Sequence, residues 1–398
     1  MNLIDRFLTY VSFPTASDEE SAVTPSTARQ LKLGKYLADE LRTLVPEVRF
    51  DEATGCVYAF LPGNDGTENA IGFISHMDTS PAAPGENINP TVIAYEGGDI
   101  PLRNGLVTDE ARFPFLKNYT GKHLVITDGN TLLGADDKAG VAEIVTALAY
   151  FAAHPEEKHK GIAAAFTPDE EVGRGTENFA LDAFRAKEAY TVDGGALGEI
   201  EYECFNAAAA KITVTGVNIH PGSAKNKMKN AALMAADLIS RLPAAETPAH
   251  TEGYEGFYHL CEMRGDEMRA TLKYIIRDHD RAKFEARKAL MAETVRYMNA
   301  LYGDCFALEM KDSYYNMRER IEDGHMDLIE NAKAAMQKNG VTPKIVAIRG
   351  GTDGAMLTFK GLPCPNLSVG AENFHGVHEF ACVEDMETMV RVICELCR

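Results

Sequence analysis

The stretch AIGFISHMD, residues 70–78, is a short apolar run that ends in a histidine and an aspartate. Its first six residues lack the alternation of polar and apolar side chains that a half-exposed strand shows, which is typical of a strand buried on both faces. Similar runs recur at 57–61, 161–167 and 189–192, and a helical pattern covers 138–153. Buried strands that alternate with helices predict an α/β fold whose sheet is covered on both faces.

Outward from this region, the pattern changes near residue 203. Two runs alternate with period two, as half-exposed antiparallel strands do, and two stretches have helical spacing: 211–216, 268–277, 230–242 and 279–302. These elements indicate a small α+β domain of one sheet and two helices, inserted at 206–316. The buried-strand pattern returns from residue 342, so we expect the other domain to consist of 1–205 and 317–398.

Composition and charge narrow the classes of function. The chain has 398 residues and a formal net charge of −19, and such a surface repels nucleic acid and anionic membranes, so we exclude both as partners. The N-terminus lacks the features of a signal peptide, and no window reaches the roughly 18 uninterrupted apolar residues of a membrane span. The eight cysteines are scattered, and the lone CxxC at Cys394 and Cys397 is a weak zinc signal. We therefore expect a cytoplasmic protein with reduced thiols.

Histidine and carboxylate side chains stand where the predicted strands end or where the helix at 138–153 begins. They are His76 and Asp78, Asp136 and Asp137, Asp169 to Glu171, Asp193, and the late pair His375 and His378. In an open α/β sheet, binding sites form beyond the carboxyl ends of the strands. We therefore expect these side chains to meet at one site.

The chemistry of this set favours metal ions. Carboxylates that meet without a counter-charge repel one another, and cations relieve the repulsion. Histidines together with several carboxylates favour Zn²⁺, although Co²⁺ or Mn²⁺ would accept the same ligands, and the number of carboxylates favours two ions. Asp78 can orient the His76 imidazole by accepting its second N–H, and one carboxylate of Glu170-Glu171 can act as a base. Each motif alone has a simpler explanation, such as a helix N-cap at Asp136-Asp137, so the prediction depends on their joint order.

The combined motifs resemble a known family. The sequences HMD at 76–78, GADDKAG at 134–140, DEEVG at 169–173 and DG at 193–194, with the late His375, are similar to those of the dinuclear zinc exopeptidases and deacylases related to aminoacylase and carboxypeptidase G. Within this family the likeness is strongest to the aminotripeptidases, through HMDTSP at 76–81, TPDEE at 167–171, NIHPGSAK at 218–225 and RGGTDG at 349–354.

The resemblance implies both a fold and an activity. The implied catalytic domain has a mixed, mainly parallel sheet flanked by helices, and the implied insertion is a lid and dimerisation domain with a four-stranded antiparallel sheet and two helices. The implied activity is that of a metal-dependent aminopeptidase that releases the N-terminal residue from tripeptides. A dipeptidase or an N-acyl amino acid deacylase of the same family is the alternative. A non-catalytic peptide-binding protein would lack the base or a ligand, whereas every expected position is filled here.

The resemblance also implies roles for single residues. One divalent ion is held by His76 and Asp193, a second by Glu171 and His375, and Asp136 bridges both, while Asp78 orients His76 and Glu170 is the general base. Asp136 is chosen over Asp137 because the family keeps the first aspartate of this pair. His375 is chosen over His378 because it stands four residues before Glu379, as the family pattern requires, and this choice is the most open one.

The inserted domain contributes further implied roles. His220 would reach across a homodimer to polarise the scissile carbonyl, and Arg277 and Arg349 would bind the terminal carboxylate of a short peptide. A guanidinium group suits that task because two parallel N–H groups meet the two carboxylate oxygens.

Overall fold

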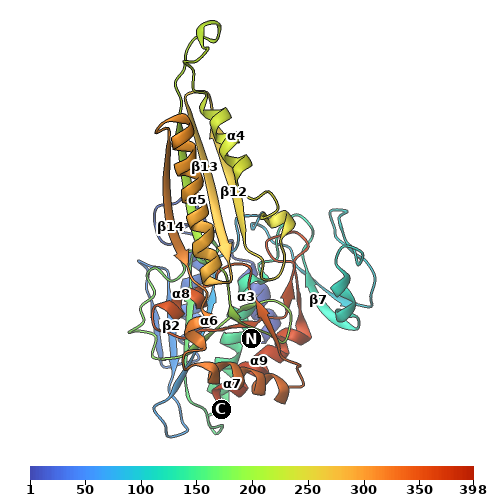
Figure 1. Cartoon of the computed structure of the whole chain (residues 1–398). Coiled ribbons are helices and arrows are strands. Elements are labelled where there is room, and N and C mark those ends of the chain that lie inside the picture. Colours follow the sequence, from blue (N-terminus) through green and yellow to red (C-terminus); the bar gives the residue numbers. More distant parts are fainter. The chain divides into compact units, whose positions relative to one another are not determined.

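The computed structural model describes all 398 residues and divides into two compact units. The first unit comprises Met1–Tyr202, Glu319–Val346 and Thr352–Arg398, and the second comprises Glu203–Arg318 and Ala347–Gly351. Each has a sheet of its own (Figure 1). The short segment Ala347–Gly351 belongs with the second unit, although the sequence pattern alone places it with the first.

The first unit contains an eight-stranded sheet in the order β1-β2-β8-β3-β9-β16-β10-β15. Its centre is parallel, because β3 pairs in parallel with β8 and β9, and β9 with β16, whereas β1, β2 and β10 pair antiparallel with their neighbours. The strands are β1 (Glu47–Phe50), β2 (Val57–Leu61), β3 (Ala70–His76), β8 (Gly161–Thr167), β9 (Ala189–Gly194), β10 (Glu199–Glu203), β15 (Lys344–Ala347) and β16 (Asn366–Ser368). The predicted α/β class with a mixed, mainly parallel sheet is confirmed.

Apolar side chains cover both faces of this sheet. Phe73 of β3 belongs to the large core cluster, while the next residue, Ile74, belongs to a separate cluster with Phe184 and Leu357. Two buried faces explain why the strand sequences are apolar throughout. The helices of this unit are α1 (Leu3–Val11), α2 (Gln30–Leu41), α3 (Ala135–Ala153), α7 (Met326–Lys338), α8 (Asp353–Phe359) and α9 (Val383–Cys397), and α6 (Arg318–Ile321) stands at its boundary.

Helix α3 is the central helix of the first unit. It contacts β3 and β9 on one side and α1 and α9 on others, which is why its sequence is apolar around most of its circumference. A Cβ added at Gly140 would lie 1.9 Å from the backbone oxygen of Val192 in β9, so only glycine lets the two backbones approach this closely. The close packing of α3 on β3 and β9 brings its first turn to the carboxyl ends of these strands.

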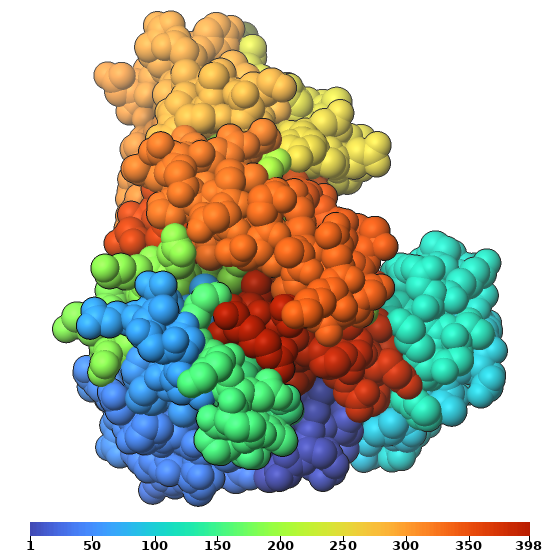
Figure 2. Space-filling model, turned by 90° about the horizontal axis from the view of Figure 1, so that it is seen from below, coloured from blue at the N-terminus to red at the C-terminus, as the bar shows by residue number.

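A second sheet of the first unit, in the order β17-β18-β7-β4, was not predicted. Its core contains Tyr95, Leu116, Leu124 and Phe380. The part between residues 91 and 126 forms a lobe, drawn in cyan at the side of Figure 2. The strands are β4 (Thr91–Tyr95), β7 (Lys122–Ile126), β17 (Ala371–Glu372) and β18 (Phe380–Cys382), with a hairpin of β5 (Ile100–Pro101) and β6 (Val107–Thr108). The loop between β17 and β18 carries His375.

The second unit is a four-stranded antiparallel sheet, β12-β13-β11-β14, with two helices. Alternate residues of β13, such as Leu272 and Tyr274, are buried in a core shared with both helices, as the period-two pattern predicts. The elements are β11 (Asn206–Thr215), α4 (Ala231–Arg241), β12 (Phe257–Gly265), β13 (Arg269–Asp278), α5 (Arg281–Tyr302) and β14 (Phe306–Tyr314). The predicted α+β insertion with this sheet and two helices is confirmed.

Short 3₁₀ helices complete the secondary structure. They cover Pro114–Tyr119, Glu170–Val172, Pro221–Ser223 and Pro248–His250. None of the helices combines the length and the apolar character that a membrane span requires.

Candidate metal centre

The predicted ligands of the first unit come from five separate segments. His76 is the last residue of β3, Asp193 lies near the end of β9, and Glu171 lies in the 3₁₀ helix that follows β8. Asp136 stands in the first turn of α3, and His375 comes from the β17–β18 loop. Because β3, β8 and β9 are parallel neighbours, their carboxyl ends meet at one edge of the sheet, as expected.

Asp136 lies between the two histidines. Its Oδ1 is 2.9 Å from Nε2 of His76, and its Oδ2 is 3.0 Å from Nε2 of His375. A further carboxylate lies beside the same nitrogen of each imidazole: Asp193 Oδ1 lies 3.4 Å from Nε2 of His76, and Glu171 Oε2 lies 3.0 Å from Nε2 of His375. The five predicted ligands therefore form two groups that share Asp136. Oδ1 of Asp136 lies within hydrogen-bonding distance of His76 in one group, and Oδ2 of Asp136 lies within hydrogen-bonding distance of His375 in the other.

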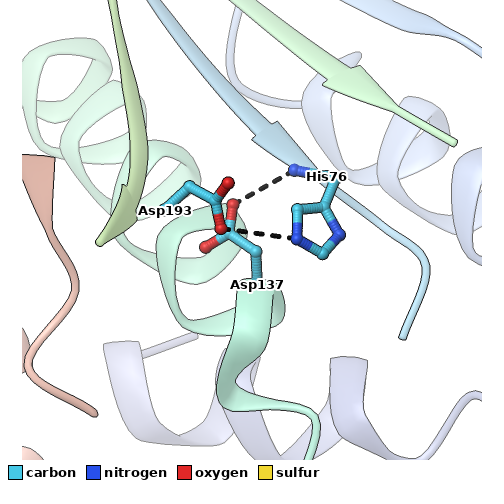
Figure 3. Close-up of side chains that lie close together, drawn as sticks. All are labelled: His76, Asp137 and Asp193. Carbon is cyan, nitrogen blue, oxygen red and sulfur yellow. Dashed lines mark hydrogen bonds and ion pairs between the residues drawn. The ribbon is translucent and has the colours of Figure 1, made fainter. Parts of the chain in front are cut away.

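Asp137 also takes part in this cluster. Figure 3 shows it beside His76 and Asp193: its Oδ2 accepts the backbone N–H of His76 at 3.1 Å. One ligand atom from each of these three residues lies within 4.8 Å of the others, and the same holds for His76, Asp136 and Glu171. Carboxylate oxygens of both neighbouring aspartates thus lie in the centre, although the family resemblance implies a ligand role only for Asp136.

Excess negative charge in a buried space shifts the pKa values of the cluster. Burial raises the pKa of Glu171 to about 7 and also raises the pKa of Glu170. Burial opposes ionisation of Asp136 too, but hydrogen bonds from His375 and His76 outweigh it and hold the pKa of Asp136 below its usual value. Hydrogen bonds to Asp136 and Glu171 raise the pKa of His375 to about 11. A cation bound among these carboxylates would relieve the repulsion between them.

The donor set fits divalent metal ions. Imidazole nitrogens and carboxylate oxygens are the ligands that Zn²⁺ shares with Co²⁺ and Mn²⁺. Oε1 of Glu171 and Oδ1 of Asp137 are buried and have no hydrogen-bond partner. A buried carboxylate oxygen without a partner is costly, and a cation between these groups would remove that cost. The residues present therefore suit the metals that the motifs predict.

Asp78 contacts both His76 and the loop that follows β8. Nδ1 of His76 lies 3.0 Å from the backbone oxygen of Asp78 and 3.4 Å from its Oδ1, so the carbonyl is the nearer acceptor and the predicted orienting role of the carboxylate stays a prediction. The Asp78 carboxylate also accepts the backbone N–H groups of Glu170, at 3.0 Å, and of Glu171, at 3.2 Å. Asp78 thus holds both His76 and the loop that carries the predicted base.

Asp169 holds the same loop, a role that the sequence pattern does not indicate. Its buried carboxylate accepts hydrogen bonds from the backbone N–H of Ser26, at 2.7 Å, and from Nε2 of Gln30, also at 2.7 Å. Its own backbone, in the left-handed region at φ 59°, donates to Oε1 of Gln30. These partners lie 139 and 143 residues earlier in the chain, so no local pattern could have indicated them.

His378, the alternative to His375, is directed elsewhere. Its Nδ1 lies 2.8 Å from Oγ1 of Thr108, and its ring packs against Phe113. The structure therefore brings His375, and not His378, onto the carboxylates. A cavity of about 550 Å³ opens beside His375 and Glu171, and it is also lined by Ser17, Asp18, Glu19, Glu20, Ser80, Pro81 and Ala82.

The three predicted residues of the second unit have separate surroundings. His220 is exposed, and its Nδ1 accepts the backbone N–H of Gly222 at 3.2 Å. Arg277 lies with its guanidinium 5.2 Å from the ring centre of Tyr314. Arg349 stacks near Phe205 and donates to the backbone oxygens of residues 251, 253 and 255. The guanidinium of Arg349 thus binds a loop of its own unit. The role that the family resemblance implies for Arg349, binding of a substrate carboxylate, stays a prediction.

Comparisons with known proteins agree with both units. The profile of the peptidase dimerisation domain matches residues 202–304. Peptidase T of Halothermothrix orenii is 52% identical over 400 residues, which cover 99% of this chain and 98% of the relative. Peptidase T of Bacillus subtilis is 50% identical over 403 residues, which cover 100% and 98%.

Solved structures agree on the fold. An aminopeptidase PepT from Bacillus cereus has a TM-score of 0.77 at 24% identity and covers 99% of this chain and 97% of its own. A tripeptidase from Staphylococcus aureus has a TM-score of 0.79 at 20% identity, with coverage of 99% and 96%. A Bacillus subtilis protein described as a dinuclear metal-binding peptidase of the M20 family has a TM-score of 0.66 at 14% identity, with coverage of 99% and 96%.

Proposed function

The chain belongs to the peptidase T family of M20 peptidases, and on this basis we propose that it is a metal-dependent aminopeptidase that releases the N-terminal residue from tripeptides. One observation carries the proposal beyond the family name. The two carboxylate oxygens of Asp136 lie 2.9 and 3.0 Å from the imidazoles of His76 and His375, which is the arrangement that a carboxylate bridging two ions requires.

The proposed cofactors are two divalent ions, with Zn²⁺ as the first choice and Co²⁺ or Mn²⁺ as alternatives. His76, Asp136 and Asp193 would hold one ion, and Asp136, Glu171 and His375 would hold the other. Asp137, one carboxylate oxygen of which lies within 4.8 Å of the ligand atoms of His76 and Asp193, is a further candidate ligand. Such ions, when bound, supply Lewis-acid polarisation of a peptide carbonyl and lower the pKa of a water molecule.

Glu170 is the proposed general base. It would accept the proton of the attacking water and pass it on to the amine that leaves. Burial raises the pKa of this carboxyl, which favours a group that must hold a proton for part of the cycle. The hydrogen bond from its backbone N–H to Asp78 fixes the base with respect to His76, because Asp78 contacts both.

The proposed substrate contacts lie in the second unit. Arg277 would bind the terminal carboxylate of the peptide, and Arg349 is a second candidate whose guanidinium would first have to leave the loop at residues 251–255. His220 would polarise the scissile carbonyl from the other subunit of a homodimer formed through this unit. The match of residues 202–304 to a dimerisation domain supports the homodimer. We also propose a cytoplasmic location, in keeping with the scattered cysteines of the sequence, which form no recognisable disulfide framework.

The proposal is tested on the full chain with a matched set of peptides. Metal content is measured by mass spectrometry, and initial rates are measured for Leu-Ala-Gly, its C-terminal amide, the dipeptide Leu-Ala and N-acetyl-leucine. We expect two divalent ions per chain and release of leucine from the tripeptide. Amidation should lower kcat/KM by about 10- to 100-fold, because a hydrogen bond to a charged group contributes about 1.5–3 kcal/mol.

Other outcomes would identify the alternatives. Preferential hydrolysis of the dipeptide or of N-acetyl-leucine would replace the tripeptidase assignment with a dipeptidase or a deacylase. A protein that binds no divalent ions, or one that binds peptides without cleaving them, would contradict the enzymatic proposal.

A further inference from the structure

Glu379 is a buried carboxylate that binds three backbone N–H groups of one turn. Only 2% of the surface of this residue is exposed to solvent. Oε2 accepts the N–H of Leu133 at 2.6 Å and that of Gly134 at 2.9 Å, and Oε1 accepts the N–H of Asp136 at 3.1 Å. Every one of these donors belongs to the turn that leads into α3 and carries the carboxylate between the two histidines.

This turn has no other side-chain cap. Gly134 occupies the N-cap position of α3 in the left-handed conformation, at φ 78°, and offers no side chain to the free N–H groups of the first turn. A carboxylate from elsewhere in the chain takes over the task that an N-cap serine or aspartate performs in other helices. The orientation of the Asp136 backbone therefore depends on a residue 243 positions later.

The segment that carries Glu379 holds Asp136 from two sides. Four residues before Glu379, His375 places its Nε2 3.0 Å from Oδ2 of the Asp136 carboxylate. Glu379 meanwhile binds the backbone N–H of the same residue. One short segment thus fixes both the main chain and the side chain of Asp136.

The buried carboxylate of Glu379 has polar and charged partners. Its carboxylate accepts three hydrogen bonds, and the buried ammonium group of Lys138, one turn further along α3, interacts electrostatically with Glu379 and Asp78. Nζ of Lys138 donates to the backbone oxygen of Phe13 at 2.8 Å, which keeps this cation in place. Burial nevertheless raises the pKa of Glu379 to about 7, because desolvation outweighs the hydrogen bonds that favour the charged form.

We propose that Glu379 is a positioning residue for the metal centre: it fixes the turn at residues 133–136 so that the two oxygens of Asp136 face two different ions. The proposal rests on the two-metal function proposed above. It gives Glu379 no contact with substrate or metal, since it acts only through Asp136. Because Asp136 is shared, loss of Glu379 should weaken the binding of both ions together.

The test compares Glu379→Gln with a matched buried carboxylate. The glutamine amide cannot accept hydrogen bonds through its NH₂ group, so at least one of the three N–H groups loses its acceptor. Glu379→Asp keeps the charge but shortens the side chain. Glu143→Gln is the control. Glu143 is fully buried in α3, the helix that begins at the turn bound by Glu379, and neither of its oxygens has a hydrogen-bond partner.

Two quantities are measured for each variant: dissociation constants of both Zn²⁺ ions in competition with a chelator, and urea unfolding of the metal-free protein. We expect Glu379→Gln to weaken both ions by about 10- to 100-fold, as loss of a residue that orients a ligand does in other metal sites. Glu379→Asp should recover part of the affinity, and it also carries the test if the glutamine variant does not fold. Glu143→Gln should bind both ions like the wild type.

The outcomes separate this inference from the function on which it rests. Wild-type affinity for both ions in folded Glu379→Gln, with only the metal-free protein less stable, would show a structural role and overturn the inference alone. Weakening of one ion but not the other would also overturn it, because the shared Asp136 predicts both. A wild-type protein that binds no Zn²⁺ would instead overturn the proposed function, and the role of Glu379 with it.

Discussion

Gly140→Ala is the substitution whose effect the structure predicts most sharply. A Cβ at this position would lie 1.9 Å from the backbone oxygen of Val192, 2.5 Å from Oγ of Ser75 and 2.6 Å from Oδ1 of Asp137. Real contacts of a Cβ begin beyond 3 Å, so α3 and β9 would have to separate by about 1 Å. Overpacking of this kind costs about 3 kcal/mol, and loss of the hydrogen bond from Ser75 Oγ to Val192 O adds about 1 kcal/mol.

Alanine favours the helix over glycine by about 1 kcal/mol, so we expect Gly140→Ala to lower the free energy of unfolding by about 3 kcal/mol, a large part of the 5–15 kcal/mol typical of a folded domain. Urea unfolding of the metal-free protein measures this directly, without the contribution of bound ions. Gly34→Ala in α2 is the control, because its Cβ would come closest to the movable ring edge of Phe50, at 2.9 Å, and would only touch the backbone oxygen of Gly55, at 3.4 Å, while alanine favours the helix by about 1 kcal/mol. Unfolding of Gly140→Ala within 1 kcal/mol of the wild type would refute the close approach of α3 to β9.

Three further predictions concern the general base, a buried carboxyl group and the metal ions of the first unit. Glu170→Gln should keep both ions, by metal analysis, but lose 10²- to 10⁴-fold in kcat, and near-normal turnover would exclude this residue as the base. Burial raises the pKa of Glu201 to about 8, so the folded state retains a proton that the unfolded chain loses, and stability falls as pH rises from about 4.5 to about 8. The glutamine of Glu201→Gln can still accept the hydrogen bond from Asn366. Without metal, this variant should have the same free energy of unfolding as the wild type at pH 4.5, but at pH 8 it should be more stable by an amount on the order of 4 kcal/mol. Equal dependence of stability on pH in the two proteins would contradict this. Removal of metal by a chelator should abolish tripeptide hydrolysis and lower the midpoint of thermal unfolding, and Zn²⁺ should restore both; activity that survives complete metal removal would contradict the proposed centre.

The main sheet and the insertion could be predicted because their patterns are local. A strand buried on both faces, such as β3, is apolar throughout, whereas polar and apolar residues alternate in a half-exposed strand, such as β13. The sequence of each strand therefore indicates which of its faces are buried. The sheet β17-β18-β7-β4 escaped prediction for the opposite reason. Its strands β7 and β18 pair over more than 250 residues of chain, and β17 and β18 contain only two and three residues. Strands this short cannot show a periodic sequence pattern, and they are extended because they pair with strands that are distant in the sequence.

The same distinction applies to the candidate site. His76, Glu171 and Asp193 follow predicted strands directly, so the edge of the sheet that they share was evident from the sequence. The contacts of Asp78 and of Arg349 were not. A His-x-Asp motif suggests that the carboxylate meets the imidazole, but the backbone carbonyl is the nearer group, which leaves the carboxylate to the loop at Glu170. A guanidinium suits any set of oxygens, and the sequence cannot tell a substrate carboxylate from the carbonyls of a nearby loop.

The adjacent pair Asp136 and Asp137 shows how one motif divides between two functions. The side chain of Asp137 is fully buried and accepts the backbone N–H of His76, so one of its oxygens joins the start of α3 to the end of β3. The side chain of Asp136 is partly exposed and meets imidazoles with both oxygens. The position of Asp136 is thus secured on three sides, by its neighbour, by His375 and, through its backbone, by Glu379. A carboxylate that must face two cations at once gains from such rigidity, because a rotation that improves its contact with one ion would weaken its contact with the other.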